Sequence, residues 1–189
     1  MWLDRVKKEY GDNLDITWKN FSLQQINSKE GPEWKVWEQV DLHEARSLLA
    51  AVAGEAARRQ GEEAHDRFHM ALLTARNRGS DRIPLNEDQP LIEVAQQAGL
   101  DVERFEKDLG DPELILVVAR DHEESTEQYG AFGSPTFVFE NGQSAYLKIF
   151  IPPEEESVEA FEHFVGLMAA RPYIGEVKRP QPPWPRGAV

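Results

Sequence analysis

The sequence predicts an α/β protein in which a mixed β-sheet is interrupted along the chain by an all-helical insert. Near both ends of the chain, apolar and polar residues alternate, which is typical of strands. Between these regions the apolar residues recur with the helical period. The chain has 189 residues, 40% of them hydrophobic, which is enough for one domain with an insert.

The first elements predicted are a helix and a strand. Residues 2–10 place their apolar side chains on one helical face, and Gly11 is a natural stop for that helix. Residues 14–20 then alternate and are rich in β-branched and aromatic types, which predicts a strand. Residues 24–40 contain Gly31 and are interpreted as a long connection.

The middle of the chain is predicted to be helical throughout. Its apolar stripes and its capping residues predict five helices, at about 41–61, 62–76, 90–99, 101–109 and 111–130. A polar stretch with Gly and Pro, residues 77–88, is predicted to be a loop.

A hairpin and a last helix complete the predicted fold. The strands are expected at about 135–140 and 145–150, joined by the strong turn signal Asn141–Gly142. Pro152 and Pro153, followed by an acidic first turn, begin the last helix. The predicted domains are therefore a discontinuous sheet domain of residues 1–40 and 126–175, a helical insert of residues 41–125, and a Pro-rich tail of residues 176–189, which is expected to be extended or mobile.

The charge and the cysteine content exclude several functions. The net charge of −13 makes nucleic acid and anionic membrane surfaces poor partners, because both are negatively charged. The sequence has no cysteine, which excludes disulfides, thiolate nucleophiles and cysteine–metal sites within it. No apolar run is long enough to span a bilayer, and we expect a cytoplasmic protein.

Other candidate residues carry weaker signals. His65 and His69 are spaced as helical metal ligands, but Asp66 follows the first histidine where a zincin has Glu, so packed histidines are favoured and no metal site is predicted. Nucleotide-binding loops and a serine-hydrolase elbow are absent from the sequence. Several tryptophans could line a groove, although core packing is their default interpretation: Trp2, Trp18, Trp34 and Trp37.

Several segments together resemble one known family. Residues 132–139, Phe-Gly-Ser-Pro-Thr-Phe-Val-Phe, are followed by the Asn141–Gly142 turn and by residues 146–148. Residues 18–23 resemble an upstream strand, and residues 56–61 and 98–101 resemble parts of a helical insert. This arrangement resembles DsbA-like thioredoxin-fold proteins from Trp2 to about Ala170. Within that family it is most similar to the bacterial cytosolic group that includes mycothiol-dependent reductases.

The resemblance implies a binding site but no catalytic residue. It implies a cis peptide bond before Pro135 and a backbone site for an extended peptide or a low-molecular-weight thiol, mycothiol or glutathione. The implied site residues are Phe132, Gly133, Ser134, Pro135 and Thr136. In the family, a first strand and a Cys-x-x-Cys turn precede the first helix, whereas this sequence begins at a position that resembles the middle of that helix.

Three functions remain open at this stage. The first is a DsbA-family oxidoreductase that is inactive in this cysteine-free, N-terminally short form. The second is a thioredoxin-like module that binds a peptide or a partner without chemistry. The third, with less support, is a relative of glutathione transferases and isomerases, which activate a bound thiol.

The first strand of the family is central in the sheet. Without it, the strands at 14–20 and 135–140 would each leave a row of unpaired backbone groups, which is costly when buried. Either the natural protein has residues before Met1 that supply the strand, or a second copy fills the edge. The sequence thus predicts a homodimer through the sheet edge if these residues are the whole protein.

Overall fold

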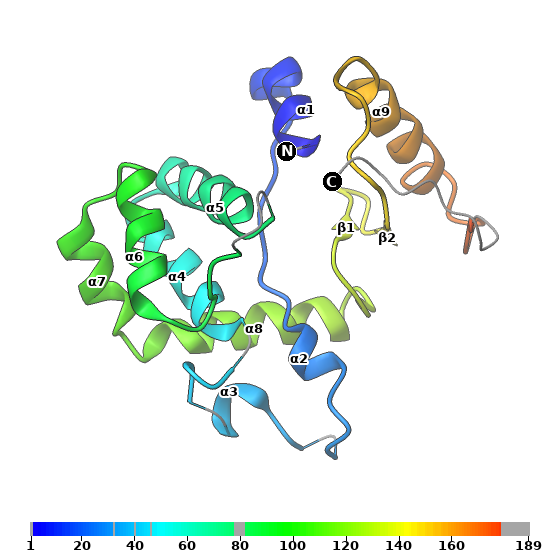
Figure 1. Cartoon of the computed structure of the whole chain (residues 1–189). Coiled ribbons are helices and arrows are strands. Elements are labelled where there is room, and N and C mark those ends of the chain that lie inside the picture. The colour runs from blue at the N-terminus through cyan, green and yellow to red at the C-terminus, as the bar shows by residue number, and fades with distance from the viewer. Residues whose placement is uncertain (1, 32, 40, 46, 78–81, 179–189) are drawn as a thin grey trace. The chain divides into compact units, whose positions relative to one another are not determined.

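The computed structural model describes residues 2–31, 33–39, 41–45, 47–77 and 82–178. Within these residues the chain forms two compact units (Figure 1). The two ends of the chain, up to Trp18 and from Ser125 onward, form the terminal unit. Residues from Lys19 to Glu124 form the helical unit.

The helical unit contains most residues of the predicted insert. Its longer helices are α4 (Leu48–Arg58), α5 (Glu62–Asn77), α6 (Asp88–Gln97), α7 (Val102–Leu109) and α8 (Glu113–Glu127), of which the last runs on into the terminal unit. Asp101 caps α7 as its sequence position predicted, because its carboxylate accepts a hydrogen bond from the Arg104 N–H at 3.1 Å. These helices, together with the small sheet of the terminal unit, confirm the predicted α/β fold class with a helical insert.

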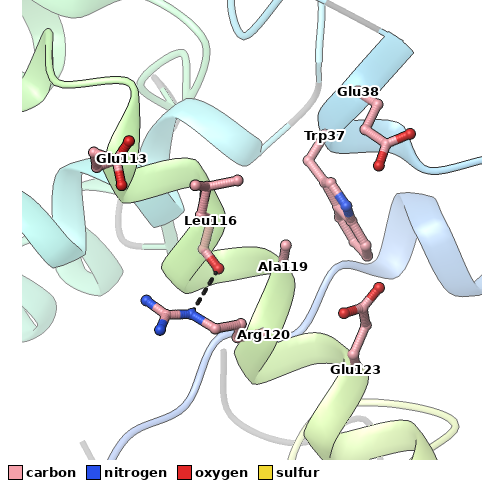
Figure 2. A pocket seen from close by; sticks show the side chains of 7 residues that line it. All are labelled: Trp37, Glu38, Glu113, Leu116, Ala119, Arg120 and Glu123. Atoms are coloured by element: carbon pink, nitrogen blue, oxygen red, sulfur yellow. Dashed lines mark hydrogen bonds between the residues drawn. The ribbon is translucent and has the colours of Figure 1, made fainter.

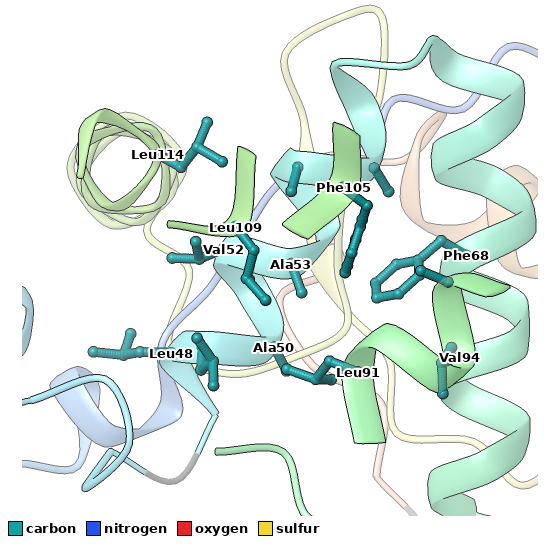
Figure 3. Close-up of a cluster of buried hydrophobic side chains, with 14 of the residues drawn as sticks. Leu48, Ala50, Val52, Ala53, Phe68, Leu91, Val94, Phe105, Leu109 and Leu114 are labelled. Carbon is teal, nitrogen blue, oxygen red and sulfur yellow. The ribbon is translucent and has the colours of Figure 1, made fainter. Parts of the chain in front are cut away.

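The core of the helical unit forms around α4 (Figure 3). This helix is rich in alanine, and its small side chains allow neighbouring helices to approach closely. Phe68 of α5 and Phe105 of α7 are both fully buried, with ring centroids 5.3 Å apart. Each such ring removes a large apolar area from water, which is the main source of stability in a unit of this size.

A buried polar clamp fixes residues 19–22 to α8. The Asn20 backbone N–H and side-chain amide both donate to Asp121, at 2.9 and 3.0 Å. The Ser22 N–H donates to Nδ1 of His122 at 3.1 Å. Asp121 and His122 are both buried, so these bonds satisfy groups that would otherwise lose water without compensation.

The terminal unit pairs α1 (Trp2–Tyr10) with α9 (Ser157–Met168). The buried Trp2 indole donates to the Ser157 carbonyl at 2.8 Å, and the Tyr10 hydroxyl donates to Glu162 at 2.8 Å. One-turn 3₁₀-helices, η1 (Gly11–Asn13) and η2 (Glu154–Glu156), follow α1 and precede α9. Gly11 has a φ of +55°, the left-handed conformation that ends a helix.

The sheet of the described residues is a two-stranded hairpin. Strand β1 (Thr136–Val138) pairs antiparallel with β2 (Ser144–Tyr146), with Phe137 opposite Ala145. Phe137 packs against Phe164 of α9 with ring centroids 4.8 Å apart, and Ala145 is buried. One face of the hairpin therefore rests on α9.

The N-terminal strand prediction is wrong in this structure. Residues 14–20 form no strand, and the described residues offer them no ladder partner. A strand is defined by pairing, so a correct alternating pattern is not sufficient where the neighbour is missing. The hairpin strands are also shorter than the predicted 135–140 and 145–150.

Several helix boundaries also differ from the prediction. The helix expected from Asp41 begins at Leu48. The connection of residues 24–40 contains α3 (Val36–Gln39), and α2 (Leu23–Ile26) begins just before it. Both are single turns, too short for a periodic pattern to reveal. Residues 78–81 of the predicted loop and residues 179–189 of the predicted tail lie outside the described residues.

The limits of the compact units differ from those of the predicted domains. Residues 19–40 group with the helical unit because the polar clamp ties them to α8. The sequence analysis assigned them to the sheet domain of residues 1–40 and 126–175. Those domain limits stay a prediction, because a compact unit is not by itself an independently folding one.

Burial of His122 makes the stability of the helical unit depend on pH. Burial, reinforced by Lys35, lowers the pKa of His122 below its ordinary value. As the pH falls below about 6.5, the unfolded chain takes up a proton at this position before the folded chain does. The free energy of unfolding should therefore decrease between pH 7 and 5.

Replacement of His122 tests this effect. His122→Asn keeps a hydrogen-bond acceptor but cannot titrate, so chemical denaturation should show a shallower pH slope. The buried His65 titrates in the same direction, so some slope should remain. His163→Asn, at an exposed position of α9, is the control and should keep the full slope. If the parent, His122→Asn and His163→Asn proteins had equal pH slopes of the free energy of unfolding, the pH dependence could not be assigned to His122.

Candidate binding site

The candidate site is the loop that joins α8 to β1. The loop begins where α8 ends: the Ala131 N–H donates to the Ser125 carbonyl at 2.9 Å, and Gly130 has a φ of +63°. The Ser144 hydroxyl of β2 donates to the Tyr129 carbonyl at 2.9 Å. These contacts fix the chain immediately before the predicted site residues.

The five predicted site residues form one short bend. The Ser134–Pro135 peptide bond is cis, the isomer expected from the resemblance. The Thr136 hydroxyl closes the bend by donating to the Gly133 carbonyl at 2.7 Å. The Phe132 ring packs on Tyr146 of β2, with centroids 5.0 Å apart.

Much of this bend is exposed. Phe132 is 67% exposed, and Ser134 and Pro135 are exposed as well. On the hairpin face opposite α9, Val138 is 46% and Tyr146 is 39% exposed. Large apolar side chains that gather on one exposed surface are typical of a binding site.

One edge of β1 has no strand partner among the described residues. The Leu147 N–H donates to the Pro135 carbonyl at 3.2 Å, and the Phe139 N–H donates to the Gln143 carbonyl at 2.9 Å. Because antiparallel pairing alternates along a strand, residues 135, 137 and 139 direct their backbone groups toward β2. Thr136 and Val138 therefore direct theirs away from it, and Ser134 lies exposed in the bend just before the strand. Among the described residues, β1 pairs only with β2.

The sequence analysis did not assign two residues of this surface to the site. Tyr146 lies directly opposite Thr136 in the hairpin register, and Val138 lies two residues along the strand. The signal that could have identified them is the Asn141–Gly142 turn, since a turn position fixes which residues are paired.

The two helical histidines pack against each other. The His65 and His69 rings stack with centroids 5.8 Å apart, and Arg58 approaches Nε2 of His65 at 3.1 Å. Burial lowers the pKa of His65, and burial lowers the pKa of His69 to about 4. Both rings are therefore neutral at pH 7. The described part of the chain contains no group of three or more His, Cys, Asp or Glu residues arranged to hold a metal ion.

Comparison with known proteins identifies the family. The model of the DSBA-like thioredoxin domain family matches residues 2–164, and the chain belongs to this family. A search of curated proteins found no match. None of the helices in the described residues is both long enough and apolar enough to span a membrane.

The sequence supplies no nucleophile of the type that thiol–disulfide exchange needs. The sequence has no cysteine, and only a thiolate attacks a disulfide. What the loop offers is backbone hydrogen-bonding groups at Ser134, Thr136 and Val138, beside the exposed rings of Phe132 and Tyr146.

Close packing at Gly133 predicts a sensitive position. A Cβ atom at this residue would lie 3.0 Å from Cε2 of Tyr146. Gly133→Ala should therefore displace the Tyr146 ring and destabilise the terminal unit by about 1–3 kcal/mol. Chemical denaturation measures the loss, and aromatic NMR signals of Tyr146 and Phe132 report the displacement.

The matched control is Gly166→Ala in α9. A Cβ atom there meets nothing within 4 Å, and alanine favours a helix by up to about 1 kcal/mol over glycine. This variant should be as stable as the parent or more so. If Gly133→Ala left both the stability and the Tyr146 signals unchanged, the described packing would be wrong.

Proposed function

We propose that this chain binds an extended peptide along the open edge of β1, from Ser134 to Val138. The open edge carries the proposal: the alternation of hydrogen bonds leaves the backbone groups of Thr136 and Val138 directed away from β2, and Ser134 is exposed just before them. An extended peptide that adds to such an edge gains a ladder of main-chain hydrogen bonds.

The side chains around the edge support a peptide with apolar residues at alternate positions. In an added strand, every second side chain lies on the hairpin face that presents Phe132, Val138 and Tyr146. Burial of these partly exposed groups contributes about 25 cal/mol for each Å² of apolar area removed from water.

We further propose that these 189 residues do not catalyse thiol–disulfide exchange. Family membership supports an oxidoreductase-like ancestry, but exchange requires a thiolate. Any redox turnover would need a cysteine from outside these residues. The purified chain should reduce insulin no faster than a protein-free blank, with turbidity as the readout. Reduction that follows the purified chain through gel filtration would contradict this proposal.

A low-molecular-weight thiol is a second candidate ligand. The exposed backbone of Ser134 favours it, because glutathione is itself a short extended peptide that one or two main-chain hydrogen bonds can hold. A second copy of this chain is a further candidate for the same edge. The three ligands are distinguished by competition and by the concentration dependence of binding.

A titration followed by amide NMR tests the peptide. The probe is the blocked peptide acetyl-Gly-Val-Ser-Val-Thr-Gly-amide, with reduced glutathione added in a parallel titration. The signals of Ser134, Thr136 and Val138 should shift most. Val138→Pro removes an outward-facing N–H and should weaken binding several-fold.

Val138→Thr is the matched control. Threonine keeps the outward-facing N–H and the β-branched shape of valine, so this variant should bind nearly as the parent does. Equal weakening by both variants, or shifts confined to other residues, would contradict the proposal. Amide signals that shift with glutathione but not with the peptide would favour the small thiol. Amide protection from hydrogen exchange that rises with protein concentration would favour self-association.

A further inference from the structure

An open groove lies between α3 and one face of α8 in the helical unit (Figure 2). Its volume is about 470 Å³. Trp37 and Glu38 of α3 form one wall. From α8, Ala119 and four residues spaced along the helix form the floor and the far side: Glu113, Leu116, Arg120 and Glu123. Their spacing of three or four residues places them on one helical face.

The floor of the groove is apolar and exposed. Leu116 is 48% exposed, whereas its neighbours Leu114 and Val118 are buried in the core. The Trp37 indole stands beside it and is itself only partly buried. An exposed leucine beside a tryptophan in a hollow offers a place where the apolar side chain of a partner can be buried.

The rim of the groove is acidic. In the described part of the chain, the carboxylates of Glu38 and Glu113 make no hydrogen bond or ion pair, and both residues are exposed. Glu123 pairs with Lys35 at 3.2 Å. Among the described residues of the lining, Arg120 is the one cation, and its Nε donates back to the Leu116 carbonyl of its own helix at 3.2 Å.

The protein itself shows which chemical group this site accommodates. Nζ of Lys35 lies 5.7 Å from the centroid of the Trp37 ring while it pairs with Glu123. An ammonium group is thus held by an aromatic face and a carboxylate together, the two groups that favour a cation. Glu38 and Glu113 add two further carboxylates to the lining of the groove.

We propose that this groove docks a short basic segment of another protein. A large apolar side chain of the segment packs on Leu116 and Trp37, and flanking Lys or Arg residues pair with Glu38 and Glu113. Charge selects this partner over a second copy of the chain: the net charge is −13, and residues 41–125 alone carry 10 Lys or Arg against 19 Asp or Glu residues. Two such surfaces repel each other, whereas a basic segment is attracted.

Fluorescence anisotropy with labelled peptides tests the proposal. The probe is Gly-Lys-Arg-Leu-Lys-Arg-Gly. One comparison peptide replaces Leu by Ser, and a second replaces each basic residue by Glu. The first should bind, more weakly as salt is added. The Ser peptide should bind several-fold more weakly, and the acidic peptide should not bind.

Protein variants distinguish binding in the groove from a general attraction of the basic peptide to an acidic protein. Leu116→Ala should weaken binding about tenfold, and the double variant Glu38→Gln with Glu113→Gln about fivefold. The matched control removes the same charge from exposed positions of α7 by Glu103→Gln with Glu106→Gln. It should bind as the parent does. Circular dichroism should show that all variants fold, because the substituted residues are exposed.

Three results would overturn the proposal. The first is no binding of the basic peptide by the parent protein. The second is equal weakening by the two double variants, which would reveal only attraction to an acidic chain. The third is a dimer in sedimentation that Leu116→Ala dissociates, which would assign the groove to a second copy.

Discussion

The packing of the hairpin on α9 is the interaction on which the proposed site depends. A two-stranded hairpin in water is marginal by itself. Here Phe164 of α9 contacts both Phe137 and Phe139, with ring centroids 4.8 and 5.8 Å apart. The Asn141 side chain of the turn also donates to the Ala169 carbonyl at 2.7 Å. Together these contacts hold β1 extended and fix which of its faces is covered.

Because α9 covers one face of the hairpin, the register determines which side chains lie on the opposite face and which backbone groups lie at the outer edge of β1. Because side chains alternate along a strand, the half-buried Phe137 and the buried Ala145 share one face and leave Val138 and Tyr146 on the opposite face. The same register directs the backbone of Thr136 away from β2. The apolar surface and the open edge are thus two consequences of one packing arrangement, and both lie beside the bend at Ser134.

The helical unit was predictable because its signals are local. Apolar periodicity located α5, α6, α7 and α8 to within a few residues, and Asp101 marked the start of α7. Residues 14–20 carry an equally clear pattern of alternation, yet form no strand. Helical hydrogen bonds close within a segment, whereas a strand needs a neighbour that its own residues cannot reveal.

The candidate site was predictable only in part. Resemblance to a family located the bend of residues 132–136, but the participation of Tyr146 depends on the register of the hairpin. The groove beside Trp37 was even harder to predict from the sequence. It combines a one-turn helix with a face of α8 that lies about 80 residues later, and only the tertiary structure brings the two together.

The central claim is that the outer edge of β1 is open for a partner strand. Amide hydrogen exchange of the purified chain at low micromolar concentration tests it most directly. The account predicts that the N–H groups of Phe137 and Phe139 exchange slowly, since they face β2, while those of Thr136 and Val138 exchange rapidly until a peptide is added. Slow exchange of Thr136 and Val138 in the monomer without peptide would contradict the claim, because those groups would already be paired.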